Sequence, residues 1–378
     1  MNTSLKLEGF KVAIGNQKTN IFGMAFINTV TRDNIIKSAV LSEIFLNSSK
    51  LFKNPVEINR RLNKMNGAVF NVGSCKKGDN LCLIVTLETL KNIAEEEAEG
   101  FIYDIVFKPY ADGISFDSGV FKRAVDTVKE RITSSKDDKK YYALQRCLEE
   151  MFDFKGYGLS ENGYIEDLEK LSTEDVYRYY EKLISGSVIE RGITGRVCVD
   201  KSEVCEDVKY ITETEETAQG RICMGFSAEG ADEAALLLLN EIIGGNAGSK
   251  LFAKVREKEN LCYYINSSLH RFKNVIIVQA GIEKAAKEKT IRLITQAVND
   301  LENNITDEDI LSAKASVKNI YLAKEDNPYG AVDNIIDSAI YGRPITINNK
   351  LEILEKTEKS DILKALEKLK LKTIYFLG

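Results

Sequence analysis

The strongest constraint on the fold is that the sequence repeats itself. The segment 168–183, LEKLSTEDVYRYYEKL, aligns without a gap on the segment 354–369, LEKTEKSDILKALEKL, which lies 186 positions later. A second pair of similar segments occurs upstream in the same order, LSEIFLNSSKLF ending at Phe52 and LNEIIGGNAGSKLF ending at Phe252. Two pairs in one order indicate a duplicated unit of roughly 190 residues.

Both repeats have the same order of predicted elements. Each begins with a strand and an apolar helix, continues through a shorter helix and a pair of strands to a longer helix, and ends on a strand. The segments carrying these patterns are 18–29, 35–47, 81–88 and 188–199 in the first repeat, and 220–228, 233–243, 274–283 and 373–378 in the second. Hairpin strands joined to helices without regular β-α-β alternation predict an α+β fold. We expect two homologous repeats, each an antiparallel β-sheet with helices packed on one side.

A third helix follows in each repeat, and its start is marked in the sequence. It is expected to open near Asp117 in the first repeat, and Thr306–Asp309 has the pattern of a capping box in the second. The polar stretch Thr212–Gly220 is the natural linker between the repeats. We therefore expect an N-terminal domain over residues 1–208 and a C-terminal domain over residues 209–378.

The charge pattern narrows the possible functions. The net charge is −5, and the Lys and Arg residues are spread through the chain, so no basic surface is predicted for a nucleic acid.

The N-terminus lacks the apolar run of about seven or more residues that a secretory signal needs. No segment approaches the roughly 18 uninterrupted apolar residues of a membrane span. These features predict a soluble, cytoplasmic protein without a nucleic-acid or membrane partner.

The residues that commonly bind metals or act as nucleophiles form no obvious site. The seven cysteines include no C-x-x-C pair, and most are expected to be buried free thiols. The single histidine, His270, has no carboxylate or cysteine at ligand spacing, and no third group is placed to orient a dyad of Cys262 and His270. The glycine-rich stretch Gly244–Gly248 lacks the ending of a phosphate loop and is expected to close a helix.

Two segments of the chain carry a resemblance to a known family, together with the order of elements. The segments are GSKLFAKVREKENLCYYINSS (248–268) and GYGLSENGYIEDLEKLSTEDVYRYYEKL (156–183). They resemble the insulinase/pitrilysin family of zinc peptidases. The likeness covers both halves, and it extends to a bacterial subfamily in which two-domain chains of about this size pair to enclose a chamber. Active members carry the inverted zinc motif H-x-x-E-H on the first long helix. Here the matching stretch is Leu41–Phe45, with leucine and phenylalanine in the histidine places and Glu43 one place out of register. The resemblance therefore implies a chain with no metal ligand and no catalytic residue of its own.

The second repeat retains another feature of the family. In active members an arginine, and a tyrosine seven residues later, hold the substrate backbone or polarise its carbonyl, and Arg256 and Tyr263 match this pair. A guanidinium is a permanently charged donor and a phenol a neutral one, so together they suit a carbonyl oxygen that gains charge. Two alternatives stay open: Arg256 forms an ion pair with Glu257 or Glu259, or Tyr264 is the relevant phenol. Tyr264 is expected to face the opposite side of its strand from Tyr263.

The resemblance thus implies the non-zinc partner subunit of a heterodimeric insulinase-type peptidase, with Arg256 and Tyr263 as substrate-binding residues. A histidine-motif peptidase subunit would be the partner, an unstructured peptide the substrate, and zinc would be bound only by the partner chain. One alternative is a catalytically inactive scaffold of the same fold. Another is a peptide-binding homodimer that uses the edge strands of its sheets.

Overall fold

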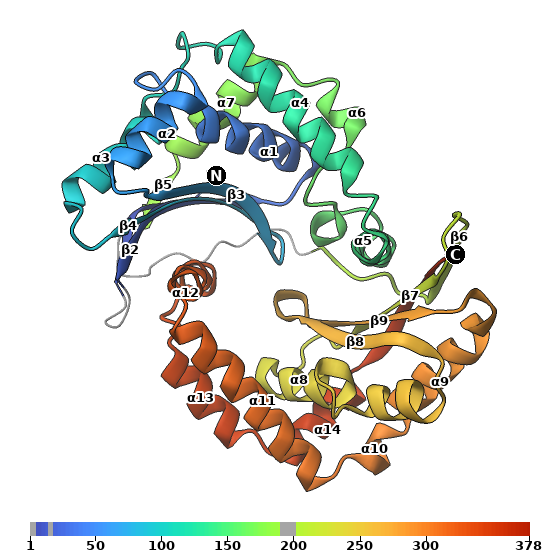
Figure 1. Cartoon of the computed structure of the whole chain (residues 1–378). Helices are drawn as coiled ribbons and strands as arrows, with labels where there is room; N and C mark the ends of the chain where they lie inside the picture. Colours follow the sequence, from blue (N-terminus) through green and yellow to red (C-terminus); the bar gives the residue numbers. More distant parts are fainter. Residues whose placement is uncertain (1–4, 14–17, 190–201) are drawn as a thin grey trace. The chain divides into compact units, whose positions relative to one another are not determined.

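The computed structural model describes residues 5–13, 18–189 and 202–378, which fold into two compact units. Of these residues, unit 1 holds those up to 135 together with 159–189 and 324–345, and unit 2 holds 136–158, 202–323 and 346–378 (Figure 1). Each unit therefore contains a segment that belongs, by its place in the sequence, to the other repeat. The expected division at residues 208 and 209 concerns the repeats and stays a prediction, because the compact units are discontinuous along the chain.

Unit 1 is built on a five-stranded sheet. Its strands are β1 (Leu5–Ala13), β2 (Thr19–Thr29), β3 (Val69–Lys77), β4 (Asn80–Leu90) and β5 (Ser187–Ile189). They lie in the order β3-β4-β2-β1-β5, with every neighbouring pair antiparallel except β1 and β5. β3 is therefore one edge strand of the sheet.

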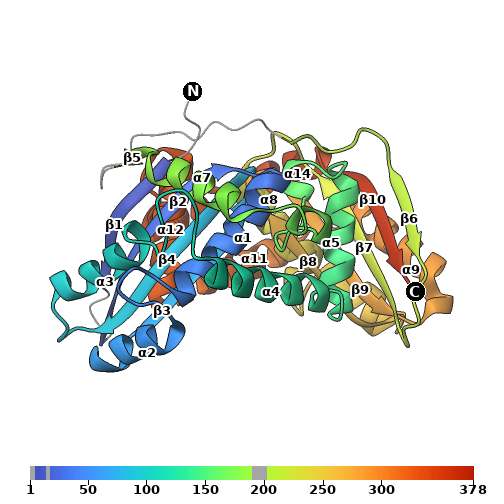
Figure 2. The same ribbon diagram turned by 90° about the horizontal axis from the view of Figure 1, so that it is seen from above.

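Helices cover both faces of this sheet. The helices of the first repeat that belong to unit 1 are α1 (Arg32–Asn47), α2 (Pro55–Lys64), α3 (Glu95–Phe107), α4 (Ser118–Ser134), α6 (Ile165–Leu168) and α7 (Thr173–Ile184). Their apolar sides form one core with the sheet. On the opposite face, α12 (Pro328–Tyr341) contacts β1 and β2, as two views show (Figures 1 and 2). The sequence pattern of the first repeat predicted only the first of these layers, because α12 is encoded in the second repeat.

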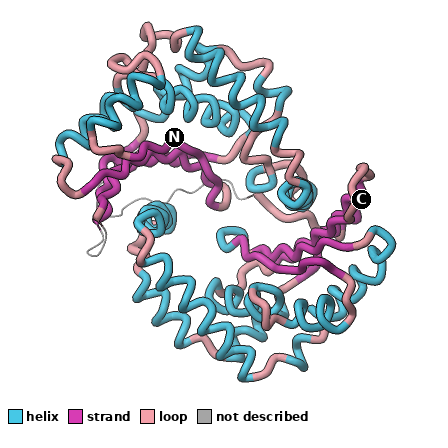
Figure 3. Tube along the Cα trace, viewed as in Figure 1, coloured by secondary structure: helices cyan, strands magenta, loops and turns pink. Residues whose placement is uncertain are grey.

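Unit 2 has a second five-stranded sheet. Its strands are β6 (Lys209–Glu213), β7 (Gly220–Ser227), β8 (Cys262–His270), β9 (Val275–Ile282) and β10 (Lys370–Leu377). They lie in the order β6-β10-β7-β9-β8, antiparallel except for β6 and β10. Figure 3 shows each sheet as a magenta layer with cyan helices against it. β8 occupies the edge position that corresponds to β3 of unit 1.

The helices of unit 2 follow the same plan. They are α5 (Lys139–Met151), α8 (Glu233–Asn240), α9 (Lys287–Asn299), α10 (Leu301–Asn304), α11 (Asp307–Glu325), α13 (Ile347–Lys356) and α14 (Lys359–Glu367), with the π-helical segments η2 (Glu241–Gly245) and η3 (Phe252–Lys258) and the short turns η1 (Gly156–Gly158), η4 (Arg271–Lys273) and η5 (Lys284–Ala286). α5, encoded in the first repeat, contacts β7 and β10 (Figure 2). α5 thus has the same place in unit 2 that α12 has in unit 1.

The predicted α+β class with two repeats is confirmed. The caps agree as well: Asp117 accepts a hydrogen bond from Val120 N at the start of α4, and Thr306 and Asp309 bond to each other's backbone N–H at the start of α11. The repeated segments form α7 and α14, each with a capping box. The expected linker is shorter than predicted, because its first two residues, Thr212 and Glu213, pair with β10 as part of β6. Residues 190–199 of one predicted strand lie outside the described residues.

The glycine-rich stretch closes the first helix of the second repeat, as expected. It does so as η2, in which the backbone of Gly244 lies so close to β8 that an added Cβ would be 2.8 Å from Ser267 N. At Gly245 an added Cβ would be 2.4 Å from the Glu241 carboxylate. Gly244 therefore permits a close approach of η2 to edge strand β8 that a side chain would prevent, and Gly245 leaves room for the Glu241 carboxylate. No helix in the described part of the chain combines the length and apolarity needed to cross a membrane.

Candidate functional site

The stretch of α1 that corresponds to the zinc motif is part of the apolar core of unit 1. Thr31 caps the helix by accepting a hydrogen bond from Asn34 N. Leu41, in the first histidine place, is completely buried, and Phe45, in the second, packs edge-to-face against Tyr180 with ring centroids 6.1 Å apart. Neither side chain carries a lone pair that could bind a metal. The residues present do not fit a zinc ion.

Glu43 is held by an arginine. Its Oε1 accepts a hydrogen bond from Arg131 Nη1 at 3.1 Å, and the Glu43 side chain is only 11% exposed. Arg131 lies in the last turn of α4. A cationic group therefore already faces the carboxylate of Glu43. This arrangement gives Glu43 a structural role as the partner of Arg131.

The second repeat contains a matching carboxylate. The alignment of the repeats places Glu241, at the start of η2, opposite Glu43. Glu241 is buried, and its Oε2 accepts a hydrogen bond of 2.7 Å from Ser316 Oγ on α11. In both units, then, a buried glutamate near the end of the first helix bonds to the third helix. Because the feature recurs in the second repeat, which is not the one that carries the zinc motif in active members, we interpret it as a helix-to-helix contact of the fold.

We expect Glu43→Ala to lower the free energy of unfolding by about 1–3 kcal/mol, because a charge-assisted hydrogen bond to Arg131 is lost. Glu241→Ala, the matched variant in the second repeat, should have an effect of similar size. Zinc content measured by atomic emission should be the same before and after either change. A loss of bound zinc on removal of Glu43 would show instead that this carboxylate is a metal ligand.

Arg256 is exposed on η3 in unit 2. Its guanidinium carbon lies 4.7 Å from the centre of the Phe252 ring, one turn earlier. Among the described residues, no carboxylate lies within ion-pair distance of Arg256. Glu259, one of the two glutamates considered as its partner, is bound by Lys289 Nζ at 2.9 Å instead. The ion-pair alternative is therefore not what the structure contains, and the charge of Arg256 faces solvent.

Tyr263 lies at the start of edge strand β8, at a β-bulge. Cys262 pairs with Ile282 and Tyr264 with Gly281, so Tyr263 is the additional residue in the ladder. A bulge changes the direction of side chains relative to simple alternation. The Tyr263 ring is 51% exposed. Tyr263 is therefore accessible to a ligand that approaches the edge of the sheet.

Tyr264, the alternative phenol, has a different environment. Its ring lies over Gly281, where an added Cβ would be 2.4 Å from the ring. Lys140 Nζ is 4.9 Å from the ring centre. Burial raises the pKa of the Tyr264 phenol to about 12, although the nearby charge of Arg221 opposes this. Tyr264 therefore packs against the sheet, and Tyr263 is the more accessible of the two rings.

The charge of Arg256 lies close to the start of β8. Burial raises the pKa of the Cys262 thiol to about 11, and the Arg256 guanidinium opposes that shift. Arg256 is the only charged group with a resolved effect on this thiol among the described residues. The predicted pair thus lies along one stretch of η3 and β8, with Cys262 between them in sequence.

The single histidine is a structural residue. His270 ends β8, and its Nδ1 is 2.7 Å from the hydroxyl of Tyr157. Cys262 begins the same strand, so the two residues are roughly 26 Å apart at about 3.3 Å per residue. A dyad of these two residues is therefore excluded, as predicted. In the part of the chain that the structure describes, no three His, Cys, Asp or Glu side chains gather to hold a metal ion.

Six cysteines lie in the described residues, and all are free thiols. Five of them are buried, as predicted, and Cys75 on β3 is half-buried. A hydrogen bond with Cys82 on the neighbouring strand lowers the pKa of the Cys75 thiol, whereas burial raises the pKa of Cys147 well above its ordinary value. Cys75 is therefore the most nucleophilic of these thiols on physical grounds.

We expect brief treatment of the native protein with iodoacetamide at neutral pH to alkylate Cys75 at least about tenfold faster than Cys147 or Cys223. Peptide mass spectrometry after short reaction times gives the rates. In urea the three rates should become similar, which serves as the control. Equal rates in the native state would contradict the burial and hydrogen bonding described above.

Comparison with known proteins agrees with this geometry. The family model described as Peptidase M16 inactive domain matches residues 197–317. The chain is 28% identical over 383 residues to the probable inactive metalloprotease YmfF of Bacillus subtilis, covering 92% of this chain and 90% of that protein. The chain is thus similar in sequence to insulinase-type peptidases of the M16 family and shares their fold. Leu41 and Phe45 stand where active members of that family carry the zinc-binding histidines.

Solved structures show the same fold. A conserved protein from Enterococcus faecalis V583 superposes with a TM-score of 0.86 at 22% identity, and the match covers 98% of both chains. The peptidase M16 inactive domain from Pseudomonas fluorescens gives a TM-score of 0.76 at 14% identity, again over 98% of both chains. The whole chain, rather than one repeat, therefore has the architecture of these proteins.

One residue of the altered motif region was not found from the sequence. Arg131, which binds Glu43, was not predicted, because its partner lies 88 positions away. The signal that could have found it is the recurrence of a glutamate at Glu43 and Glu241. A carboxylate that is present in both repeats needs a fixed donor in both, and the third helix of each repeat is the neighbouring element.

Proposed function

We propose that the chain is the non-zinc partner subunit of a heterodimeric insulinase-type peptidase. In this proposal it supplies Arg256 and Tyr263 to peptide hydrolysis by a second chain that bears the zinc-binding histidines. The observation that carries the proposal is the contrast between the two repeats. The motif positions of unit 1 are filled by core side chains, whereas Arg256 of unit 2 is exposed and has no ion-pair partner among the described residues.

The chemistry of the pair suits a peptide carbonyl. The guanidinium of Arg256 is charged at every physiological pH and presents several N–H donors in a fixed plane. The Tyr263 hydroxyl adds a neutral donor. Donors that are in place before the reaction stabilise the negative charge that a carbonyl oxygen gains during attack. We propose that both residues bind an unstructured peptide, and that this chain itself holds no zinc.

A pure scaffold would have no chemical need for an arginine at this exposed position, where no carboxylate of the described residues pairs with it. The same holds for a tyrosine ring turned outward by a β-bulge at an edge strand. Both features favour the catalytic-partner role over the scaffold role. We further propose that the complex is cytoplasmic, because free thiols are typical of reducing compartments.

Complex formation and zinc content test this proposal. The chain would be expressed alone and together with a histidine-motif M16 chain from the same organism. We expect the two chains to elute together in size-exclusion chromatography, with one zinc per pair by atomic emission and none in the chain alone. A chain that forms only homodimers, or that binds zinc by itself, would contradict the proposal. Stable assembly with a partner that cleaves nothing would favour the scaffold.

A further inference from the structure

Unit 1 contains a cavity of about 600 Å³ between α3 and the strands β1 and β2. The cavity is formed by residues of unit 1, whereas Arg256 and Tyr263, the proposed substrate-binding pair, belong to unit 2. Its volume lies in the range of small-molecule sites, which are roughly 300–1,000 Å³. Nothing described so far gives it a role.

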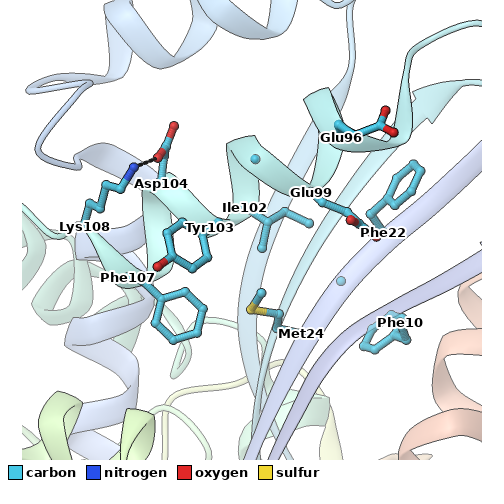
Figure 4. Close-up of a pocket in the computed structure, with 12 residues that line it drawn as sticks. Phe10, Phe22, Met24, Glu96, Glu99, Ile102, Tyr103, Asp104, Phe107 and Lys108 are labelled. Carbon is cyan, nitrogen blue, oxygen red and sulfur yellow. Dashed lines mark hydrogen bonds and ion pairs between the residues drawn. The ribbon is translucent and has the colours of Figure 1, made fainter. Parts of the chain in front are cut away.

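The walls of the cavity are mainly apolar and aromatic. Phe10, Phe22 and Met24 line it from the strands, and Tyr103 and Phe107 line it from α3, as Figure 4 shows. Tyr103 is half exposed, so its ring lies at the mouth of the cavity. An apolar body the size of one aromatic ring system would therefore contact rings on both sides.

A glycine in the middle of α3 helps to keep the space open. Gly100 lines the cavity, and a Cβ added to it would meet no atom within 4 Å. Glycine destabilises a helix interior relative to almost every other residue. Its presence here therefore has no explanation in the stability of the helix, and any side chain longer than alanine at this position would enter the cavity.

The charge at the mouth is negative and unbalanced. Glu96 and Glu99 line the cavity, are exposed, and have no lysine or arginine within ion-pair distance among the described residues. Their neighbours on α3 are neutralised: Glu95 pairs with Lys11, Glu97 with Arg61 at 3.0 Å, and Asp104 with Lys108 at 2.7 Å. Two carboxylates one turn apart thus remain to receive a cation.

We propose that this cavity binds a compound in which an ammonium or guanidinium group is attached to an aromatic ring or a branched apolar group. The apolar body fills the space beside Gly100, and the cation lies between Glu96 and Glu99, near the face of Tyr103. Charge-assisted hydrogen bonds and a cation–π contact stabilise the cation at this position. The compound can be a free amine or a peptide residue that presents the same two groups.

Fluorescence titration is the direct test, because the chain contains no tryptophan and an indole ligand can be observed without background. The probe is tryptamine, and the matched compounds are tryptophol, which is neutral, and indole-3-propionate, which is anionic. We expect tryptamine to bind at least about tenfold more tightly than tryptophol, the effect of one charged hydrogen bond. Equal binding of the three compounds would overturn the proposal. So would a protein that binds neither tryptamine nor the peptides described below.

Variants locate the site. Glu99→Gln should weaken tryptamine binding about tenfold, whereas Glu174→Gln, at an exposed position on α7, should leave it unchanged. Gly100→Phe should abolish binding by filling the cavity, and Gly100→Ala should preserve it, with thermal unfolding showing that both variants fold. Binding that survives Gly100→Phe in a folded protein would overturn the assignment.

A second titration separates the two sources of the ligand. It uses capped peptides that contain either Trp-Lys or Trp-Glu in an otherwise neutral sequence. Preference for the Trp-Lys peptide with the same response to Glu99→Gln would identify a peptide ligand, and binding of tryptamine alone would identify a free amine. Both outcomes support the proposed chemistry. Because Arg256 and Tyr263 are not involved, failure of this proposal would leave the peptidase-partner proposal unaffected.

Discussion

Arg256→Ala should lower kcat/KM of the assembled two-chain peptidase by about 10²–10³-fold, the range for removal of one donor to a developing oxyanion. The stability of the chain should change by no more than about 0.5 kcal/mol, since Arg256 is exposed and forms no ion pair with a described residue. The measurement is hydrolysis of a quenched fluorescent peptide by the co-purified pair, at substrate concentrations that give kcat and KM separately.

Two variants control this result. Lys258→Ala removes another exposed cation from the end of the same π-helical segment and should leave kcat/KM within about twofold of the unmodified pair. Tyr263→Phe removes only the hydroxyl and should lower kcat/KM by a smaller factor than Arg256→Ala, because the phenol is uncharged. An Arg256→Ala pair with unaltered kinetics would remove arginine from the proposed chemistry.

Lys77→Met should lower the free energy of unfolding of unit 1 by about 3–5 kcal/mol, the usual effect of breaking a buried ion pair from one side. Lys77 ends β3, and its Nζ lies 2.8 Å from Asp337 Oδ1 and also pairs with Asp333. Both aspartates are on α12, and Asp337 is completely buried. The substitution removes the positive charge that faces them while keeping most of the side-chain volume. Urea unfolding followed by circular dichroism measures the change.

The pH dependence of this contribution follows from the pKa of Lys77. Burial lowers that pKa, but the negative charges of Asp337 and Asp333 together raise it by more than burial lowers it, so the net shift is upward. Because the pKa of Lys77 is higher in the folded than in the unfolded state, the charged lysine stabilises the folded state fully at neutral pH. This contribution is lost only as the pH rises through the pKa of Lys77 in the folded state, which lies above about 10.4. Lys64→Met, at an exposed position on α2, should change stability by no more than about 0.5 kcal/mol. A similarly small effect at Lys77 would show that α12 is not held by this ion pair.

Much of the fold could be predicted from local patterns. The repeated segments, the caps at Asp117 and Thr306, and the apolar strands specify elements through interactions between residues that are close in sequence. The exchange of α5 and α12 between the units could not be predicted in the same way. An amphipathic helix has the same pattern whichever sheet it covers, so only the folded chain shows that α12 completes unit 1.

The candidate site was predictable in part for a similar reason. Leu41 and Phe45 occupy the two histidine places of the zinc motif, so the sequence alone excludes imidazole ligands there. The environment of Tyr263 was not predictable, because strand alternation assumes that each residue has one partner and a bulge breaks that rule. The partner of Glu43 was also missed, because Arg131 comes close only when α1 and α4 pack together. Long-range packing thus decided each point that the sequence left open.

The most direct test of the proposed heterodimer is a titration of a histidine-motif M16 partner chain with this chain, in which the rate of peptide hydrolysis is measured. We expect that neither chain alone cleaves the peptide, that activity rises in proportion to added chain, and that it saturates at one chain per partner. Hydrolysis by this chain alone, or a partner whose rate is unchanged at every ratio, would contradict it.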